Sequence, residues 1–189
     1  MSAITLTKPM TAEELYTLPD DGLDRELIRG ELRERPMTRR NRWHGQTEAN
    51  LSFLLKDWHR QQRAPIGKVY AGEVGCILQR DPDTAVGVDV AFVAAATVAR
   101  QTDETTMIDG PPLLAVEILS PSDKQDEILD KVGEYLAAGV ELVWVVEPRY
   151  RTVTVYRRDA EPELFNVRQE LTAEPHLPGF RVSVAAIFE

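Results

Sequence analysis

Two apolar runs near the middle of the chain, residues 87–93 and 113–119, predict buried β-strands. Runs of this length are typical of strands that are covered on both faces of a sheet. Each run contains a single acid, Asp89 in the first and Glu117 in the second. A buried ionised carboxylate is costly unless a cation or hydrogen bonds compensate it, so both acids need partners.

The alternation of side chains along a strand identifies the neighbours of each acid on its own face. Beside Asp89 these neighbours are Gly87 and Ala91, and beside Glu117 there is Ala115. Bulkier residues fall on the opposite faces, where a helix layer could cover them. We expect the small neighbours to leave space beside the acids for an ion, its water molecules and a phosphate.

Apolar residues at helical spacing, together with capping signals, predict three helices. Thr11 and Glu14 form the pattern of a capping box at the start of the first helix. Ser122 or Asp123 is well placed to cap the third helix, and Gly139 to end it. The expected helical ranges are 11–19, 43–62 and 123–138.

Further strands are expected where apolar stretches lie between turn-forming residues. Hairpins are predicted around Arg29-Gly30 and around residues 148–151, and a turn at residues 81–83 joins another strand pair. The expected strand ranges are 25–35 for the first hairpin, then 74–79, 88–94, 113–119, 142–147, 152–157 and 163–167, with a closing segment at 178–180.

This element order predicts an α/β or α+β protein with a mixed central sheet flanked by helices. The 189 residues, 43% hydrophobic and 28% charged, suit a single domain with a substantial core. No repeat or interdomain linker is evident. We expect one domain over residues 1–189, with the main core over 11–158 and C-terminal strands over 159–189.

Cysteine content and hydropathy favour a cytoplasmic protein. The single Cys76 cannot form an internal disulfide. No apolar segment approaches the roughly 20 residues of a membrane span, and residues 1–9 lack the layout of a signal peptide. No membrane partner is therefore expected.

Charge is distributed unevenly along the chain. The formal net charge of −9 argues against a general nucleic-acid binder. The segment from Arg29 to Arg42 nevertheless holds six arginines and two glutamates, a net +4, so the rest carries −13. This segment could contact phosphates, or it could be a solvated hairpin and loop. The candidate nucleic-acid contacts in it are Arg33, Arg35, Arg39, Arg40 and Arg42.

A divalent metal ion between Asp89 and Glu117 would compensate both acids. Hard cations such as Mg²⁺ prefer oxygen ligands and keep several waters. A bound metal can activate water and offset charge on a phosphate, and Lys131 on the following predicted helix could assist. The order acid, acid, lysine thus indicates a metal-dependent phosphodiesterase site. The three histidines are scattered, which argues against zinc.

With these motifs in this order, the chain resembles the Uma-two family of restriction-endonuclease-like proteins, in the PD-(D/E)XK nuclease superfamily. The resemblance covers roughly residues 11–188. The matching stretches are 25–31, His44-Gly45, 88–93, 114–122, Lys131 with Tyr135 and Gly139, 143–148 and 177–180.

The resemblance implies a restriction-endonuclease-like core in which Asp89 and Glu117 ligate Mg²⁺, with Mn²⁺ as a substitute. It also implies that Lys131 is the catalytic lysine and that Glu26 is a third acid at the edge of the site. In the superfamily pattern the lysine lies two residues after the second acid, where this chain has Leu119. Lys131 must therefore reach back into the sheet from the next helix.

Each of these residues also has a purely structural interpretation. Lys131 lies four residues after Glu127, as in an ordinary surface ion pair. Glu26 could be an edge-strand charge. Tyr135, one turn after Lys131, could pack beneath the site, hydrogen-bond within it or contact nucleic acid. His44 opens a helix, and we expect it to have a local packing or surface role.

The leading functional hypothesis is a Mg²⁺-dependent DNA endonuclease, with DNA as its partner. A homodimer or larger homo-oligomer is compatible with duplex cleavage, although the sequence shows no interface. A second hypothesis is an inactive or weakly active nuclease fold that serves as a binding protein or scaffold. A third is a metal phosphoesterase that acts on small nucleotides.

Overall fold

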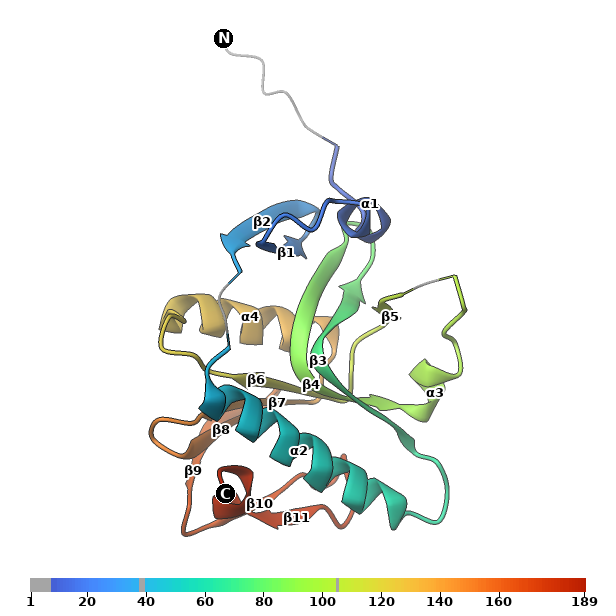
Figure 1. The fold of residues 1–189 in the computed structure, drawn as a ribbon. Helices are drawn as coiled ribbons and strands as arrows, with labels where there is room; N and C mark the ends of the chain where they lie inside the picture. The colour runs from blue at the N-terminus through green and yellow to red at the C-terminus, as the bar shows by residue number, and fades with distance from the viewer. Residues whose placement is uncertain (1–7, 38–39, 105) are drawn as a thin grey trace.

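A large mixed β-sheet organises the chain. The structure, a computed structural model, describes residues 8–37, 40–104 and 106–189 (Figure 1). Within these residues nine strands form the main sheet. They are β1 (Leu23–Ile28), β2 (Glu31–Pro36), β3 (Gly67–Gln79), β4 (Thr84–Ala94), β5 (Ile108–Asp109), β6 (Leu114–Ile118), β7 (Leu142–Glu147), β8 (Thr152–Arg157) and β9 (Ala160–Asn166).

The strand order is β2-β1-β4-β6-β7-β8-β9, with β3 paired to β4 and to the short β5. The β6–β7 and β3–β5 pairs are parallel, and the other pairs are antiparallel. One edge of β4 pairs with β3. The other edge pairs with β1 at Ala85 and with β6 from Val90 to Phe92. Between these two pairings, residues 86–89 of β4 form an opening in the sheet.

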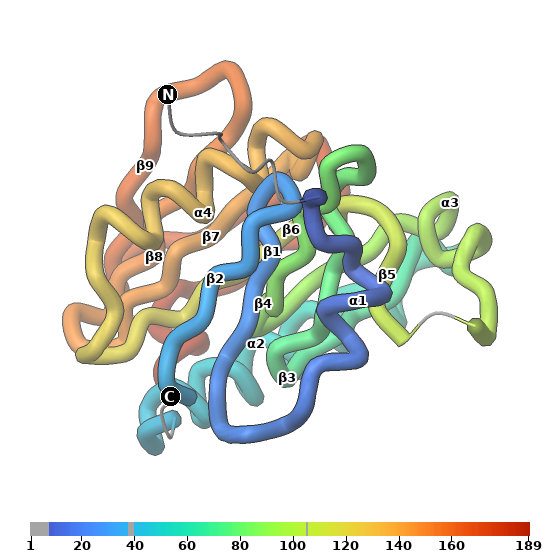
Figure 2. The backbone as a smooth tube through the Cα atoms, turned by 90° about the horizontal axis from the view of Figure 1, so that it is seen from above, coloured from blue at the N-terminus to red at the C-terminus, as the bar shows by residue number. Residues whose placement is uncertain are grey.

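Two helices cover opposite faces of the sheet. Helix α2 (Arg42–Arg60) packs on one face with Phe92 and Trp144, and α4 (Gln125–Ala138) packs on the other with Ala91 and Ala115. Figures 1 and 2 show this layering in two views. The remaining elements are α1 (Ala12–Tyr16), α3 (Ala95–Val98), β10 (Glu170–Thr172), β11 (Arg181–Ser183) and the 3₁₀ helix η1 (Val184–Ile187). Among the described residues, no helix is both long and apolar enough to cross a membrane.

The fold class predicted from the sequence is confirmed, and most of the expected elements are present. Thr11 and Glu14 form both hydrogen bonds of the capping box. The first hairpin turns at Arg29 and Gly30, which have φ angles of 54° and 79°. Two positive φ values in succession are what a two-residue type I′ turn requires. Gly139 ends α4 in the left-handed region, with φ of 98°.

Several local expectations were wrong: β4 begins at Thr84 rather than near residue 88, and β9 begins at Ala160 rather than near residue 163. Strand β3 begins at Gly67 rather than near residue 74, because a bulge between Ala71 and Val74 interrupts its alternation while pairing to β4 continues. The N-cap of α4 is Lys124, without a side-chain cap hydrogen bond. Asp123 does not cap the helix because its carboxylate instead accepts a hydrogen bond from the backbone N–H of Ser120.

The C-terminal residues complete the core beneath α2. Phe180 is 1% exposed, and its ring centroid lies 5.8 Å from that of Trp58 and 5.6 Å from that of Trp144. Aromatic pairs at such distances stabilise a core beyond the area that they bury. The chain after β9 is therefore packed into the same core as the sheet.

We expect Phe180→Ala to lower the free energy of unfolding by about 3–5 kcal/mol, because it leaves a cavity between two tryptophans. Phe53→Ala is the matched control, since Phe53 lies on α2 but is 63% exposed. The control should change stability by less than about 0.5 kcal/mol. Urea unfolding followed by tryptophan fluorescence measures both; equal stability of the two variants would contradict the packing described.

Candidate active site

The antiparallel register of β4 and β6 brings the two buried acids together. Val90 is paired with Val116, so Asp89 and Glu117 are the next residues along the two strands and face the same side. Ala91 and Ala115, paired with each other, lie beside them on that face. The small neighbours expected from the sequence thus leave room next to both carboxylates.

Asp89 is held by a backbone group and faces two nitrogen-bearing side chains. Its side chain is 5% exposed, and Oδ2 accepts a hydrogen bond of 2.7 Å from the N–H of Ile118. Oδ1 lies 3.3 Å from Nε2 of His44 and 3.7 Å from Nη2 of Arg40. Burial acts to raise the pKa of Asp89, but His44 and the Ile118 N–H outweigh it, so the pKa is lowered. Asp89 is therefore ionised at neutral pH.

Glu117 lies in a less compensated environment. Its side chain is 9% exposed, Oε1 accepts a hydrogen bond of 2.5 Å from the Tyr135 hydroxyl, and Oε2 lies 3.1 Å from Nζ of Lys131. Burial raises the pKa of Glu117 to about 7, with a further contribution from the charge on Asp89, although Lys131 opposes both. This carboxyl group can gain or lose a proton near neutral pH.

Lys131 reaches back from α4 into the opening of the sheet. Its Nζ donates to the carbonyl oxygen of Gly87 at 2.9 Å and lies 2.9 Å from Oε1 of Glu26, in addition to its contact with Glu117. The Gly87 carbonyl is accessible because neither β1 nor β6 pairs with β4 there. Burial would lower the pKa of Lys131, but Glu117 and Glu26 raise it above its usual value. The structure thus gathers Asp89, Glu117, Glu26 and Lys131 in one place.

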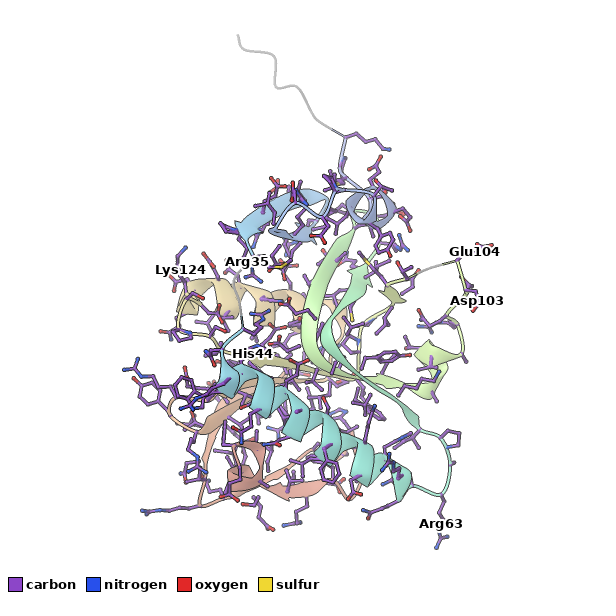
Figure 3. The ribbon with its side chains drawn as sticks, viewed as in Figure 1. Arg35, His44, Arg63, Asp103, Glu104 and Lys124 are labelled. Atoms are coloured by element: carbon purple, nitrogen blue, oxygen red, sulfur yellow. The ribbon has the colours of Figure 1, made fainter. Side chains whose placement is uncertain are left out.

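A cavity of about 290 Å³ opens beside this cluster. Its lining residues come from β1, β2, β3, β4, β6 and α4 and from the loops that precede α2 and α4. They are Asp24, Glu26, Ile28, Arg33, Glu34, Arg35, Arg40, Glu73, Asp89, Glu117, Ile118, Asp123, Lys124, Glu127, Ile128, Lys131 and Glu134. Arg35 and Lys124 mark the rim of this region in Figure 3, above the start of α2.

The arginines predicted to contact nucleic acid have different surroundings. Arg33, Arg35 and Arg40 line the cavity, although Arg35 is paired with Asp24 and Arg40 with Glu73. Arg42 stacks over the ring of Trp43, with its guanidinium carbon 4.6 Å from the ring centroid, and does not line this cavity. Arg39 lies outside the described residues.

Tyr135 is placed differently from the expected nucleic-acid contact. It is fully buried, and its hydroxyl group donates to Glu117. Because the ring lies under the acids, it cannot stack on a base at the surface. It hydrogen-bonds within the candidate site, which was one of the interpretations left open by the sequence.

Two residues of the site were missed in the sequence. His44 is 1% exposed and faces Asp89, so of the expected packing or surface roles only the packing role remains. Glu73 lies in the bulge of β3 with φ of 53° and lines the cavity. A glycine within a strand, here Gly72, is a recognised signal of a bulge. The position of His44 carried no such local signal, because it depends on how α2 crosses the sheet.

Comparisons with known proteins agree on the class of fold. A crystal structure of "a putative nuclease belonging to DUF820" from Anabaena variabilis ATCC 29413 superposes with a TM-score of 0.76 at 21% sequence identity. The match covers 95% of this chain and 98% of the other. The chain therefore shares the α+β fold of that protein.

The model of the Uma2 family, described as "Putative restriction endonuclease", matches residues 12–185. The chain belongs to this family, which confirms the resemblance found in the sequence. The search of curated proteins gave no match.

The raised pKa of Glu117 predicts a stability effect of pH in the metal-free protein. The folded state holds this proton more tightly than the unfolded state, so the stabilisation is present below about pH 4.5 and is lost as pH rises through about 7. Glutamine mimics the protonated acid, so Glu117→Gln does not lose this stabilisation as pH rises. Its free energy of unfolding relative to that of wild type should therefore increase by on the order of 1–3 kcal/mol from pH 5 to pH 8.

Urea unfolding in the presence of a chelator at the two pH values measures this difference. Glu147→Gln is a suitable control, because Glu147 does not line the cavity beside the cluster and its carboxylate accepts a hydrogen bond from the N–H of Arg149. A difference between wild type and Glu117→Gln that stays constant with pH, or that falls as pH rises, would contradict the account of this carboxyl group.

Proposed function

We propose that this protein is a metal-dependent endonuclease that hydrolyses phosphodiester bonds in DNA. The observation that carries the proposal is the convergence of Asp89, Glu117 and Lys131 at one cavity, from two strands and a helix. Membership of the Uma2 family and the nuclease-like fold support the hydrolytic class.

The donor groups fit a hard divalent cation. No backbone group among the described residues donates to Oδ1 of Asp89, and Glu117 offers a second carboxylate on the neighbouring strand. Among the described residues no three His, Cys, Asp or Glu side chains form a ready-made metal cage. Mg²⁺ does not require one, since it is usually held by one or two carboxylates and completed by waters and substrate phosphates. When bound, such an ion would supply an activated water and offset phosphate charge.

The protein's own residues have separable tasks in this proposal. Asp89, ionised at neutral pH, and Glu117 hold the cation. Lys131 is a positioned charge that orients the attacking water or stabilises the developing phosphate charge. Glu26 holds the Lys131 ammonium group against the opening in β4, so that it does not swing into solvent. Arg33, at the cavity and exposed, contacts the phosphate backbone.

The cavity lining also favours a second candidate, a metal phosphoesterase that acts on small nucleotides. Several acids surround the rim, including Glu34, Asp123, Glu127 and Glu134. These charges would repel a long polyanion more than a mononucleotide. Comparison of mononucleotides with polymer substrates separates the two candidates.

Cleavage assays with duplex, single-stranded and flapped DNA, with Mg²⁺ or Mn²⁺, test the main proposal. Asp89→Asn, Glu117→Gln and Lys131→Met should each lower the rate by about 100-fold or more, because each removes a charge that the reaction needs. Lys56→Met, on the exposed side of α2, is the control for Lys131 and should stay within about twofold of wild type. Equal activity of wild type and the Asp89 and Glu117 variants would show that cleavage occurs elsewhere or comes from a contaminant.

The phosphate contact of Arg33 is tested through the salt dependence of DNA binding. Arg33→Ala should weaken binding and reduce the slope of log affinity against log salt by about 1, as expected for one lost phosphate contact. Arg63→Ala is the control, because Arg63 lies beyond the other end of α2 (Figure 3). Fluorescence anisotropy of labelled DNA, with Ca²⁺ in place of Mg²⁺, measures both slopes. An unchanged slope for Arg33→Ala would remove this residue from the interface.

A further inference from the structure

His44 is a buried histidine whose polar atoms lack hydrogen bonds. It lies in the first turn of α2, at the N-terminal end of that helix in Figure 3, and it is 1% exposed. Within the described residues, neither Nδ1 nor Nε2 has a hydrogen-bond partner. An unsatisfied buried polar group costs about 1–3 kcal/mol, so its retention calls for an explanation.

The position of Nε2 indicates which kind of partner it lacks. Nε2 lies 3.3 Å from Oδ1 of Asp89, close enough to help lower the pKa of that acid, but the ring is poorly aligned for a hydrogen bond to that oxygen. Two donor atoms that bind one small divalent ion at about 2.1 Å, with a right angle between the bonds, lie about 3.0 Å apart. The observed separation is close to that value. Oδ1 is also the oxygen that the Ile118 N–H does not use.

We propose that His44 Nε2 is a protein ligand of the metal ion beside Asp89, so that the site selects Mn²⁺ over Mg²⁺. Imidazole nitrogen binds first-row transition metals, whereas Mg²⁺ prefers oxygen donors. The inference rests on the proposed function for the presence of a metal, and it adds a ligand and a metal preference.

The surroundings of His44 support the role of a ligand. Oε2 of Glu48, one helical turn later, lies 3.9 Å from Nδ1. A carboxylate on the far side of a ligating imidazole is a common arrangement, because it fixes the ring and its tautomer. At 3.9 Å Glu48 does not hydrogen-bond to the ring, but it places a negative charge on the side of the imidazole away from Asp89.

The region already attracts a cation. The Arg40 guanidinium group pairs with Glu73 and lies 3.7 Å from the same Asp89 oxygen that faces His44. The Arg40 side chain is 31% exposed and can withdraw toward solvent, whereas His44 is enclosed. A metal ion bound beside Asp89 would therefore displace Arg40 and leave His44 in place.

Pulsed electron paramagnetic resonance of Mn²⁺ added to the chelator-treated full chain tests the proposal. Wild type should show the ¹⁴N modulation of a directly bound imidazole, and calorimetry should show Mn²⁺ bound at least about tenfold more tightly than Mg²⁺. His44→Gln should lose the ¹⁴N signal, bind Mn²⁺ about 10–100-fold more weakly and lose the preference over Mg²⁺. His59→Gln, at the other end of α2, should match wild type.

The wild-type spectrum decides the matter even if His44→Gln does not fold. Bound Mn²⁺ without ¹⁴N modulation, or an unchanged signal in His44→Gln, would overturn the proposal. Failure of wild type to bind Mn²⁺ would overturn it as well, and with it the metal of the proposed function. A ¹⁴N signal without any DNA cleavage would uphold the ligand and remove only the nuclease activity.

Discussion

Two carboxylates buried side by side on neighbouring strands are the constraint on which this structure depends. Asp89 and Glu117 repel each other where water is largely excluded, and such a pair is tolerated only if donors or cations surround it. The protein supplies the Ile118 N–H to one acid, and Tyr135 and Lys131 to the other. The compensation is unequal, since the pKa of Asp89 is lowered and that of Glu117 is raised to about 7. The pair is thus ready to take up a further positive charge.

The geometry of β4 explains why the cluster forms at this point of the sheet. One edge of β4 pairs with β1 near its start and with β6 near its end, which leaves residues 86–89 without a partner strand there. A lysine from α4 fills that opening and satisfies the Gly87 carbonyl. Lys131 can reach the opening from the helix because α4 packs on this face of the sheet.

Much of the fold and part of the candidate site could be predicted from local sequence. The hairpin at Arg29 and Gly30, the capping box at Thr11 and the helix end at Gly139 each rest on the chemistry of a few adjacent residues. The small neighbours of Asp89 followed from strand alternation. The bulge in β3 broke that alternation, so the sequence pattern alone placed the start of the strand too late.

The sequence by itself determined which residues form strands and helices, and that two acids lie in apolar surroundings, because these properties depend on neighbours along the chain. The family resemblance implied that Glu26 and Lys131 belong to the site, but only the tertiary structure brings them, and His44 with them, beside those acids. These contacts depend on the register of β4 with β6 and on the end of the β1–β4 pairing at Ala85. They also depend on where α2 and α4 cross the sheet. Such relations are set by packing between distant segments. For the same reason Tyr135, a helix residue without a distinguishing local pattern, proved to lie beneath the site with its hydroxyl on Glu117.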